Sequence, residues 1–307
     1  MIRVLTYNIL VGGTSRVDHI EQMIRAAQPD VVGLVEATNP CVVEELAARL
    51  GMDYRMSGRG EHDLDWHVAL LSRLPIIHAQ VHFRPDRLSK PLLEVVVQEE
   101  QGGVLALFVT HLKASFAGGM RGGDGIRREE AREVARIMKA KRGTPHLLMG
   151  DLNSLAPGDT FRASRLLRYL VNMDERHRTR PHESVGHPYL DFVVPPSLRF
   201  LEPLMRVTAR NAFLSALFDS AGSLYVARGT IRLLRNTGYV DCFRRLNGES
   251  EGFTCPSGAP AGRIDYIFAS PELAPRLSSC YVVTEAAGAR GEQASDHLPV
   301  LAEFGED

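Results

Sequence analysis

The stretch His146-Leu147-Leu148-Met149-Gly150-Asp151-Leu152-Asn153 places two polar side chains directly after a short run of apolar residues. Such a run is typical of a buried strand, and we predict a strand over residues 146–149. Where a buried strand runs into a loop, a rigid scaffold carries variable side chains, so strand ends collect ligand-binding residues in α/β sheets. Asp151 and Asn153 are therefore candidates for a functional site.

Five other segments also place a polar residue at one end of a strand-like apolar run. They are Asn8 after residues 4–7, Glu36 after 31–35, His111 after 108–110, Asp265 between 263–264 and 266–268, and Asp296-His297 before 298–304. Singly, such a carboxylate most often caps a helix or lies in a solvated turn, and a lone histidine most often packs. Three Asp, one Glu, two Asn and two His at such positions in one chain favour a shared site.

The ligand types in this set favour a hard divalent cation. Carboxylate and amide oxygens suit Mg²⁺ or Mn²⁺ better than zinc. The four cysteines are scattered along the chain and form no CxxC pair, which disfavours a thiolate zinc site. They stand at Cys41, Cys242, Cys255 and Cys280.

Apolar periodicity predicts alternating strands and helices over the first half of the chain. We expect strands at 3–9, 31–35, 68–71, 76–82, 92–98, 104–110 and 146–149, and helices at 17–27, 42–50 and 127–142. Gly102-Gly103 predicts a hairpin turn between two of these strands. Strand–helix–strand units mixed with hairpins indicate two packed sheets with outer helices rather than one parallel sheet.

Length and composition set the broad class. A chain of 307 residues with 44% hydrophobic and 24% charged residues fits a soluble globular protein of one large or two smaller domains. The net charge of −1 counts mildly against a protein dedicated to the nucleic-acid backbone. No apolar run approaches the ~20 residues that span a bilayer. We expect a cytoplasmic protein without stable membrane insertion.

Residues 155–240 differ from the rest, with 12 Arg and no Lys against 7 Asp plus Glu. This stretch is either an ordinary solvated helical insertion or an Arg-rich lid over an anionic substrate, whose oxygens the arginine fork would match. Within it, residues 200–218 carry a helix-like apolar pattern. That patch fits a core element, a lid face, a dimer contact or a membrane-surface element, and core packing is the favoured interpretation.

Taken together, the motifs resemble those of the endonuclease/exonuclease/phosphatase superfamily over almost the whole chain. The resemblance rests on Asn8, Glu36, Thr110-His111-Leu112, Gly150-Asp151-Leu152-Asn153, Arg263-Ile264-Asp265-Tyr266 and Ser295-Asp296-His297-Leu298-Pro299, in this order. It implies an α/β fold, a four-layer sandwich of two packed mixed sheets flanked by helices. It also implies a single catalytic domain over residues 1–307, with an Arg-rich, mainly helical insertion at about 155–240.

The resemblance implies a role for each motif residue. Glu36 would be the principal metal ligand, with Asn8 and Asp296 helping to hold the metal or its waters. Asp151 would orient or deprotonate the attacking water, and Asn153 would hydrogen-bond the nucleophile or a phosphate oxygen. Asp265 would accept a hydrogen bond from one ring nitrogen of His297. His297 would then face the phosphorus, as a general base or as a charged donor.

Other residues are weaker candidates. His111 follows a threonine, as in the deoxyribonuclease, sphingomyelinase and inositol phosphatase branches, and this disfavours abasic-site repair. Arg127 is a candidate for contact with a substrate phosphate, with a surface arginine as the alternative. One of Asp63, Asp65 and His67 is a candidate for contact with the site, with a solvated loop as the favoured alternative. Tyr266 receives no catalytic role.

The leading hypothesis is a Mg²⁺-dependent phosphoric ester hydrolase, a phosphodiesterase or phosphatase acting on a small or lipid-linked substrate. The alternative is a metal-dependent nuclease acting on DNA or RNA, favoured if the basic insertion and Arg127 line an open groove. A non-catalytic binding protein on the same scaffold is disfavoured, because a degenerate relative would normally have lost one of the motif residues. The sequence leaves the oligomeric state undetermined.

Overall fold

The computed structural model describes residues 1–58, 67–114, 122–179, 200–286 and 288–305. Within them, two six-stranded mixed sheets pack face to face, and β1 and β2, like β7 and β8, are parallel neighbours. The first sheet has the order β11 (Leu277–Val282), β14 (Val300–Phe304), β1 (Ile2–Asn8), β2 (Val31–Val35), β4 (Val68–Ser72) and β3 (Asp53–Met56). The second has the order β5 (Ile76–His82), β6 (Leu92–Gln98), β7 (Val104–His111), β8 (His146–Asp151), β10 (Asp265–Ala269) and β9 (Val240–Asp241). A small ribbon joins β12 (Glu285–Ala286) to β13 (Ala289–Arg290).

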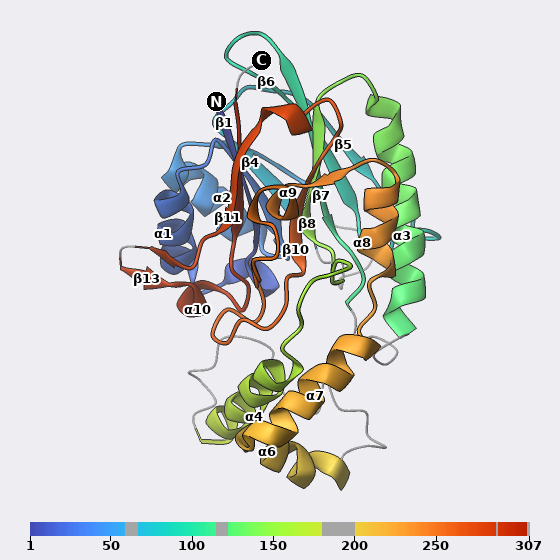
Figure 1. Cartoon of the computed structure of the whole chain (residues 1–307). Helices are drawn as coiled ribbons and strands as arrows, with labels where there is room; N and C mark the ends of the chain where they lie inside the picture. Colours follow the sequence, from blue (N-terminus) through green and yellow to red (C-terminus); the bar gives the residue numbers. More distant parts are fainter. Residues whose placement is uncertain (59–66, 115–121, 180–199, 287, 306–307) are drawn as a thin grey trace.

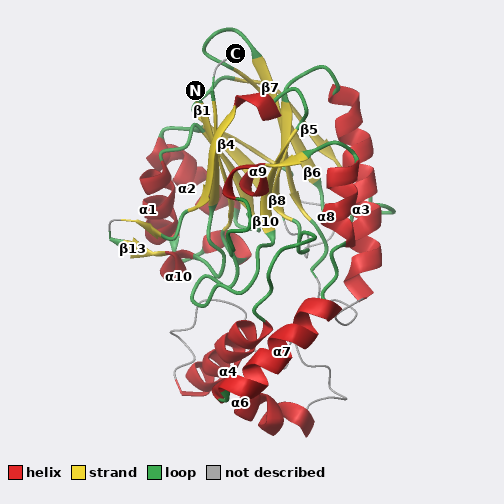
Figure 2. Cartoon of the chain, in the orientation of Figure 1, coloured by secondary structure: helices red, strands yellow, loops and turns green. Residues whose placement is uncertain are grey.

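Helices cover the outer face of each sheet, so the molecule has the four layers expected from the sequence (Figure 2). On the first sheet lie α1 (Val17–Ala27) and α2 (Pro40–Leu50), and on the second lie α3 (Gly122–Met138) and α8 (Gly229–Asn236). Their apolar residues recur at helical spacing, and α1 for example buries Ile20, Ile24 and Ala27 against the sheet. Shorter helices are α9 (Cys242–Asn247), α10 (Gly291–Ala294), and the 3₁₀ turns Val11–Gly13, Lys139–Lys141 and Ala274–Arg276.

Among the described residues, three further helices form a separate bundle beyond one edge of the sheets (Figure 1). They are α4 (Ala163–Thr179), α6 (Glu202–Arg210) and α7 (Ala212–Tyr225). Leu167, Leu170 and Val171 of α4 pack with Ala209 of α6 in a small core of their own. Although α8 also falls within residues 155–240, it packs on α3 instead of joining this bundle.

The element boundaries differ from the predicted ones in two informative places. Helix α3 begins five residues before Arg127 and ends at Met138, where the chain tightens into the 3₁₀ turn Lys139–Lys141. Residues 200–218 form no single helix, because Asn211 has extended backbone and caps α7 by accepting a hydrogen bond from Leu214 N. Phe213 is 77% exposed and Leu217 61% exposed, so core packing is wrong for these side chains.

The interior between the sheets is filled by side chains from both inner faces, with one close approach at Gly33 of β2. A Cβ at Gly33 would lie 2.7 Å from Met149 Sδ of β8. We expect Gly33→Ala to lower the free energy of unfolding by about 1–3 kcal/mol through overpacking, as measured by urea denaturation. Combined with Met149→Ala, Gly33→Ala should cost less than it does alone, because the two positions share one space and the smaller side chain leaves room for the added Cβ.

Gly125→Ala is the matched control, because a Cβ at that exposed helical position meets no atom within 4 Å. It should be neutral or slightly stabilising, since alanine is the better helix former. Equal losses in Gly33→Ala and Gly125→Ala would contradict this account of the sheet interface.

Candidate active site

The polar residues predicted from strand ends converge at one edge of the two sheets. Asn8 is the last residue of β1, Glu36 follows β2, and His111 and Asp151 end β7 and β8. Strands β10 and β14 run antiparallel to β8 and β1, so Asp265 at the start of β10 and His297 just before β14 reach the same edge. Asp151 has His111 and Asp265 as its direct strand partners.

Asp151, Asp265 and His297 form a tight, buried group. One potential ligand atom from each of the three lies within 4.8 Å of the others. His297 Nδ1 donates to Asp265 Oδ2 at 2.8 Å, so its Nε2 faces Asp151 Oδ2 at 3.9 Å. On the other side, His111 Nε2 lies 3.6 Å from the same Asp151 oxygen. Two imidazoles thus flank one carboxylate.

Asn8 joins this group to Glu36. Asn8 Nδ2 donates to Glu36 Oε1 at 3.1 Å and to Asp151 Oδ2 at 3.3 Å, which links the ends of the two sheets. The other Glu36 oxygen accepts from Val11 N at 2.8 Å. Glu36 has a φ of 58°, a left-handed conformation that costs energy for a residue with a side chain and clusters at functional sites.

Asp296 and Asn153 lie at the margins of the cluster. Asp296 is half-buried, and its neighbour Ser295 anchors the segment by donating from Oγ to the Asn8 carbonyl at 2.7 Å. Asn153 donates from its backbone N to Asp151 Oδ1 at 2.8 Å and from Nδ2 to the Leu112 carbonyl at 3.1 Å. Asn153 therefore orients Asp151 through its main chain.

Arg127 is neither a surface arginine nor a member of the cluster. It is 1% exposed and donates from one terminal nitrogen to the Lys113 carbonyl at 3.2 Å. Burial lowers its pKa, against the charges of Asp124, Glu130 and Asp151. Asp63, Asp65 and the single tryptophan, Trp66, lie outside the described residues. His67 is buried beside the site, where its carbonyl accepts from Ala37 N.

The surroundings shift the pKa values of the two histidines in opposite directions. Burial acts to lower the pKa of His297, but the Asp265 charge and hydrogen bonds to Asp265 and Cys255 raise it well above its ordinary value. Burial and the positive charges of Lys90 and His297 lower the pKa of His111 well below its ordinary value. His297 is therefore suited to carry a proton near neutral pH, and His111 to be neutral.

Burial and the nearby charge of Asp265 raise the pKa of Asp151 to about 7. Such a carboxylate lacks enough positive charge around it in the protein alone, and a cation beside it would favour its ionised form. The oxygen donors of Glu36, Asn8 and Asp151 are of the type that Mg²⁺ and Mn²⁺ bind. The donor set thus fits a hard divalent ion.

Two cationic residues of the site were missed by sequence reasoning. Lys90, just before β6, is buried, and burial lowers its pKa to about 8 against the charges of Asp151, Glu36 and Glu130. Arg16, before α1, donates to the Leu10 and Ala294 carbonyls, and burial lowers its pKa against the charges of Asp296, Tyr7 and Glu36. Arg16 lies at no strand end, and Lys90 is separated from the strand 92–98 by Pro91, so the strand-end pattern singled out neither residue.

Comparison with known proteins gives a family and several solved structures with a similar fold. The model of the endonuclease/exonuclease/phosphatase family matches residues 5–297. Solved structures with a similar fold include an AP endonuclease from Archaeoglobus fulgidus, with 16% identity, 99% of each chain covered and a TM-score of 0.62. A 3'-5' exonuclease (NExo) from Neisseria meningitidis has 17% identity, covers 99% of this chain and 100% of its own, and has a TM-score of 0.62.

Humanized D. rerio TDP2 has 16% identity, 99% coverage of each chain and a TM-score of 0.60. No curated protein matches the sequence. At these identities the structural likeness shows the fold alone, whereas the family model spans nearly the whole chain, from residue 5 to His297. The protein therefore belongs to the endonuclease/exonuclease/phosphatase family.

Proposed function

We propose that the protein is a Mg²⁺- or Mn²⁺-dependent hydrolase of phosphate esters, acting on a small or lipid-linked substrate. The observation that carries this proposal is the convergence of Asp151, Asp265 and His297 with the linked pair Asn8 and Glu36. Family membership supports phosphoric ester hydrolysis, and the buried acidic and histidine groups support a metal ion and a proton carrier.

Each residue has a role that its contacts allow. Glu36, with Asn8 and Asp296, would hold the ion, which when bound supplies positive charge beside the phosphate and lowers the pKa of a coordinated water. Asp151 would orient the attacking water or accept its proton, with Asn153 holding its other oxygen. His297, kept charged by Asp265, would donate to a phosphate oxygen as negative charge builds there. On the side of Asp151 away from His297, His111 would supply a neutral imidazole and Lys90 a positive charge.

The nuclease alternative receives less support from this geometry. That alternative requires both the basic insertion and Arg127 to line an open groove, but the Arg127 side chain is buried. Nicking of supercoiled plasmid at trace enzyme, lost at high salt, would nevertheless favour it over the leading proposal. Hydrolysis of a lipid or sugar phosphodiester in a panel of esters, without such nicking, would support the leading proposal.

The role of Glu36 can be tested by metal addition. With bis-p-nitrophenyl phosphate, we expect turnover that requires Mg²⁺ or Mn²⁺ and disappears with a chelator. A metal concentration of about 100 Kd should stabilise the wild-type protein by about 2.7 kcal/mol, seen as a higher melting temperature. In Glu36→Gln, both the turnover and this thermal shift should fall steeply, because a neutral amide replaces a charged ligand.

Glu100→Gln is the matched control, because Glu100 is an exposed residue in the turn between β6 and β7. It should retain both the turnover and the metal-induced shift. A Glu36→Gln protein with an unchanged shift would remove Glu36 from the metal site, and wild-type turnover in chelator would remove the metal from the proposal.

A further inference from the structure

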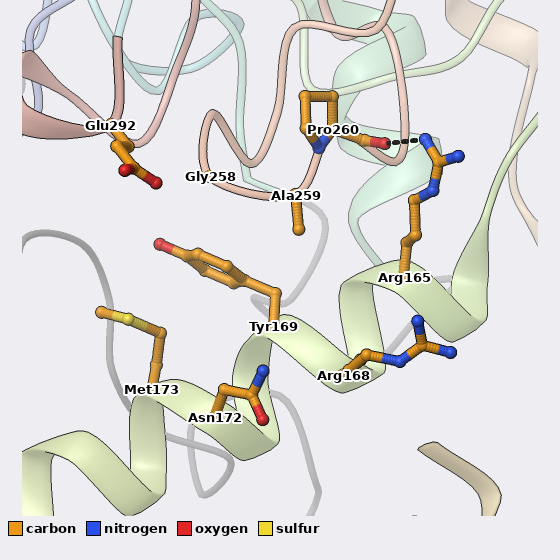
Figure 3. Close-up of a pocket in the computed structure, with 9 residues that line it drawn as sticks. All are labelled: Arg165, Arg168, Tyr169, Asn172, Met173, Gly258, Ala259, Pro260 and Glu292. Atoms are coloured by element: carbon orange, nitrogen blue, oxygen red, sulfur yellow. Dashed lines mark hydrogen bonds between the residues drawn. The ribbon is translucent and has the colours of Figure 1, made fainter. Parts of the chain in front are cut away.

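A cavity of about 390 Å³ lies between helix α4 and the loop around Gly258–Pro260 (Figure 3). Its walls include Arg165, Arg168 and Tyr169 of α4, and Glu292 of α10. This volume lies within the range of small-molecule sites. Among the described residues, none of those that line the cavity belongs to the strand-end cluster.

The cavity adjoins the candidate active site through its loop wall. Ser257, next to the lining residue Gly258, donates from its backbone N to the Asp296 carbonyl at 2.7 Å and from Oγ to the Ser295 carbonyl at 2.6 Å. On the helix side, burial raises the pKa of Tyr169, and the Asp296 charge adds to that rise while the His297 charge opposes it. Glu292, which lines the cavity, stands only three residues before Ser295, so the cavity and the Ser295-Asp296 segment share one stretch of chain.

The cavity lining carries an acidic residue at one end and two basic residues at the other. Figure 3 shows the Tyr169 ring projecting from α4 with its hydroxyl end toward Glu292, whereas the two arginines lie on the opposite side. Arg165 donates to the Pro260 carbonyl at 3.1 Å, and Arg168 donates through Nε to the Ala209 carbonyl at 3.0 Å. These bonds anchor both side chains, and because a guanidinium has five N–H groups, several remain to bind an anion.

We infer that this cavity is a substrate subsite for a cyclic organic group that carries a second phosphate, bonded to the scissile phosphate at the cluster. The ring lies against Tyr169, its hydroxyl or amino groups donate to Glu292, and Arg165 and Arg168 bind the second phosphate. The inference rests on the proposed function, since it takes the cluster as the place of reaction. A nucleotide and a sugar phosphate share the required chemistry.

The test is equilibrium binding to the full-length protein in chelator, so that no turnover is needed. Probes are adenosine 5'-monophosphate and glucose 1-phosphate, each beside its unphosphorylated form, and inorganic phosphate alone. Tyr169→Ala should weaken binding of the phosphorylated probe roughly 5- to 100-fold, the range of one lost ring–aromatic contact. Tyr169→Phe should bind nearly as the wild type, and Arg168→Ala should weaken the phosphorylated probe far more than its unphosphorylated form.

Controls are Tyr281→Ala and Arg162→Ala, which remove residues outside the cavity lining. Preference for the nucleotide or for the sugar phosphate identifies the source of the ring. The inference is overturned if neither probe binds at millimolar concentration, or if binding is insensitive to both Tyr169→Ala and Arg168→Ala. Bis-p-nitrophenyl phosphate hydrolysis is measured separately, so loss of the proposed function and loss of the subsite give different results.

Discussion

Replacing Asp151 by asparagine should reduce metal-dependent hydrolysis of bis-p-nitrophenyl phosphate by about 10²–10⁴-fold and yet stabilise the metal-free protein. Activity falls because an amide can neither accept a proton nor balance a cation. Stability rises because the variant removes a buried charge that the fold holds at a cost. The pKa of Asp151 is about 7 in the folded protein, against an ordinary value of 3.8, owing to burial and Asp265.

The stability gained in Asp151→Asn should depend on pH, because folding raises the pKa of Asp151. Because the folded pKa is the higher one, the folded state binds the proton more tightly than the unfolded chain does. Stability therefore falls as pH rises from about 4 to about 7, and above that range the full cost, up to about 4 kcal/mol, is present. Asparagine carries no charge, so its advantage over the wild type should be small near pH 4 and largest near pH 8.

Urea denaturation in chelator at these two pH values measures the effect. Asp53→Asn serves as the control, because Asp53 is an exposed residue of β3 and should show almost no difference. An Asp151→Asn protein that is less stable than the wild type at pH 8, or whose advantage does not grow with pH, would refute the description of Asp151 as an uncompensated buried carboxylate.

Replacing Arg263 by methionine should lower the free energy of unfolding by about 3–5 kcal/mol. The Arg263 guanidinium is 1% exposed and donates to both oxygens of Asp159, at 2.9 and 3.2 Å, and to both oxygens of Asp241, each at 2.8 Å. It also lies 4.4 Å from the centre of the Tyr266 ring. Methionine fills similar space but leaves two buried carboxylates without their main partner.

Two comparisons separate this effect from a simple loss of packing. Asp159→Asn should cost less in Arg263→Met than in the wild type, because Asp159 has then lost Arg263 and keeps only its 2.9 Å pair with Arg244. Arg162→Ala, which removes an exposed pair with Glu251, should cost less than about 1 kcal/mol. A loss in Arg263→Met no larger than in Arg162→Ala would contradict the buried network.

Individual residues show which parts of the site can be predicted from the sequence and which cannot. The strands ending at Asn8, His111 and Asp151 were predicted to within two residues, because a buried strand needs a continuous apolar run that is visible locally. Neither interpretation of Arg127, as a substrate contact or as a surface arginine, predicted that its side chain is buried. Nothing in the local pattern distinguishes an exposed helical arginine from a buried one. Lys90 and Arg16 were missed for a related reason, because their partners come from distant segments.

The order and identity of the motif residues, together with apolar periodicity, determined the family, the four-layer architecture and the set of polar residues worth examining. These properties are local, or depend only on order along the chain. The tertiary structure alone decided that Asp151 lies between His111 and Asp265, that Asp265 raises the pKa of His297, and that Tyr169 lines a cavity beside the loop that contacts Asp296. Charge states and cavities depend on burial and on distances between segments far apart in sequence, and only the folded chain sets those quantities.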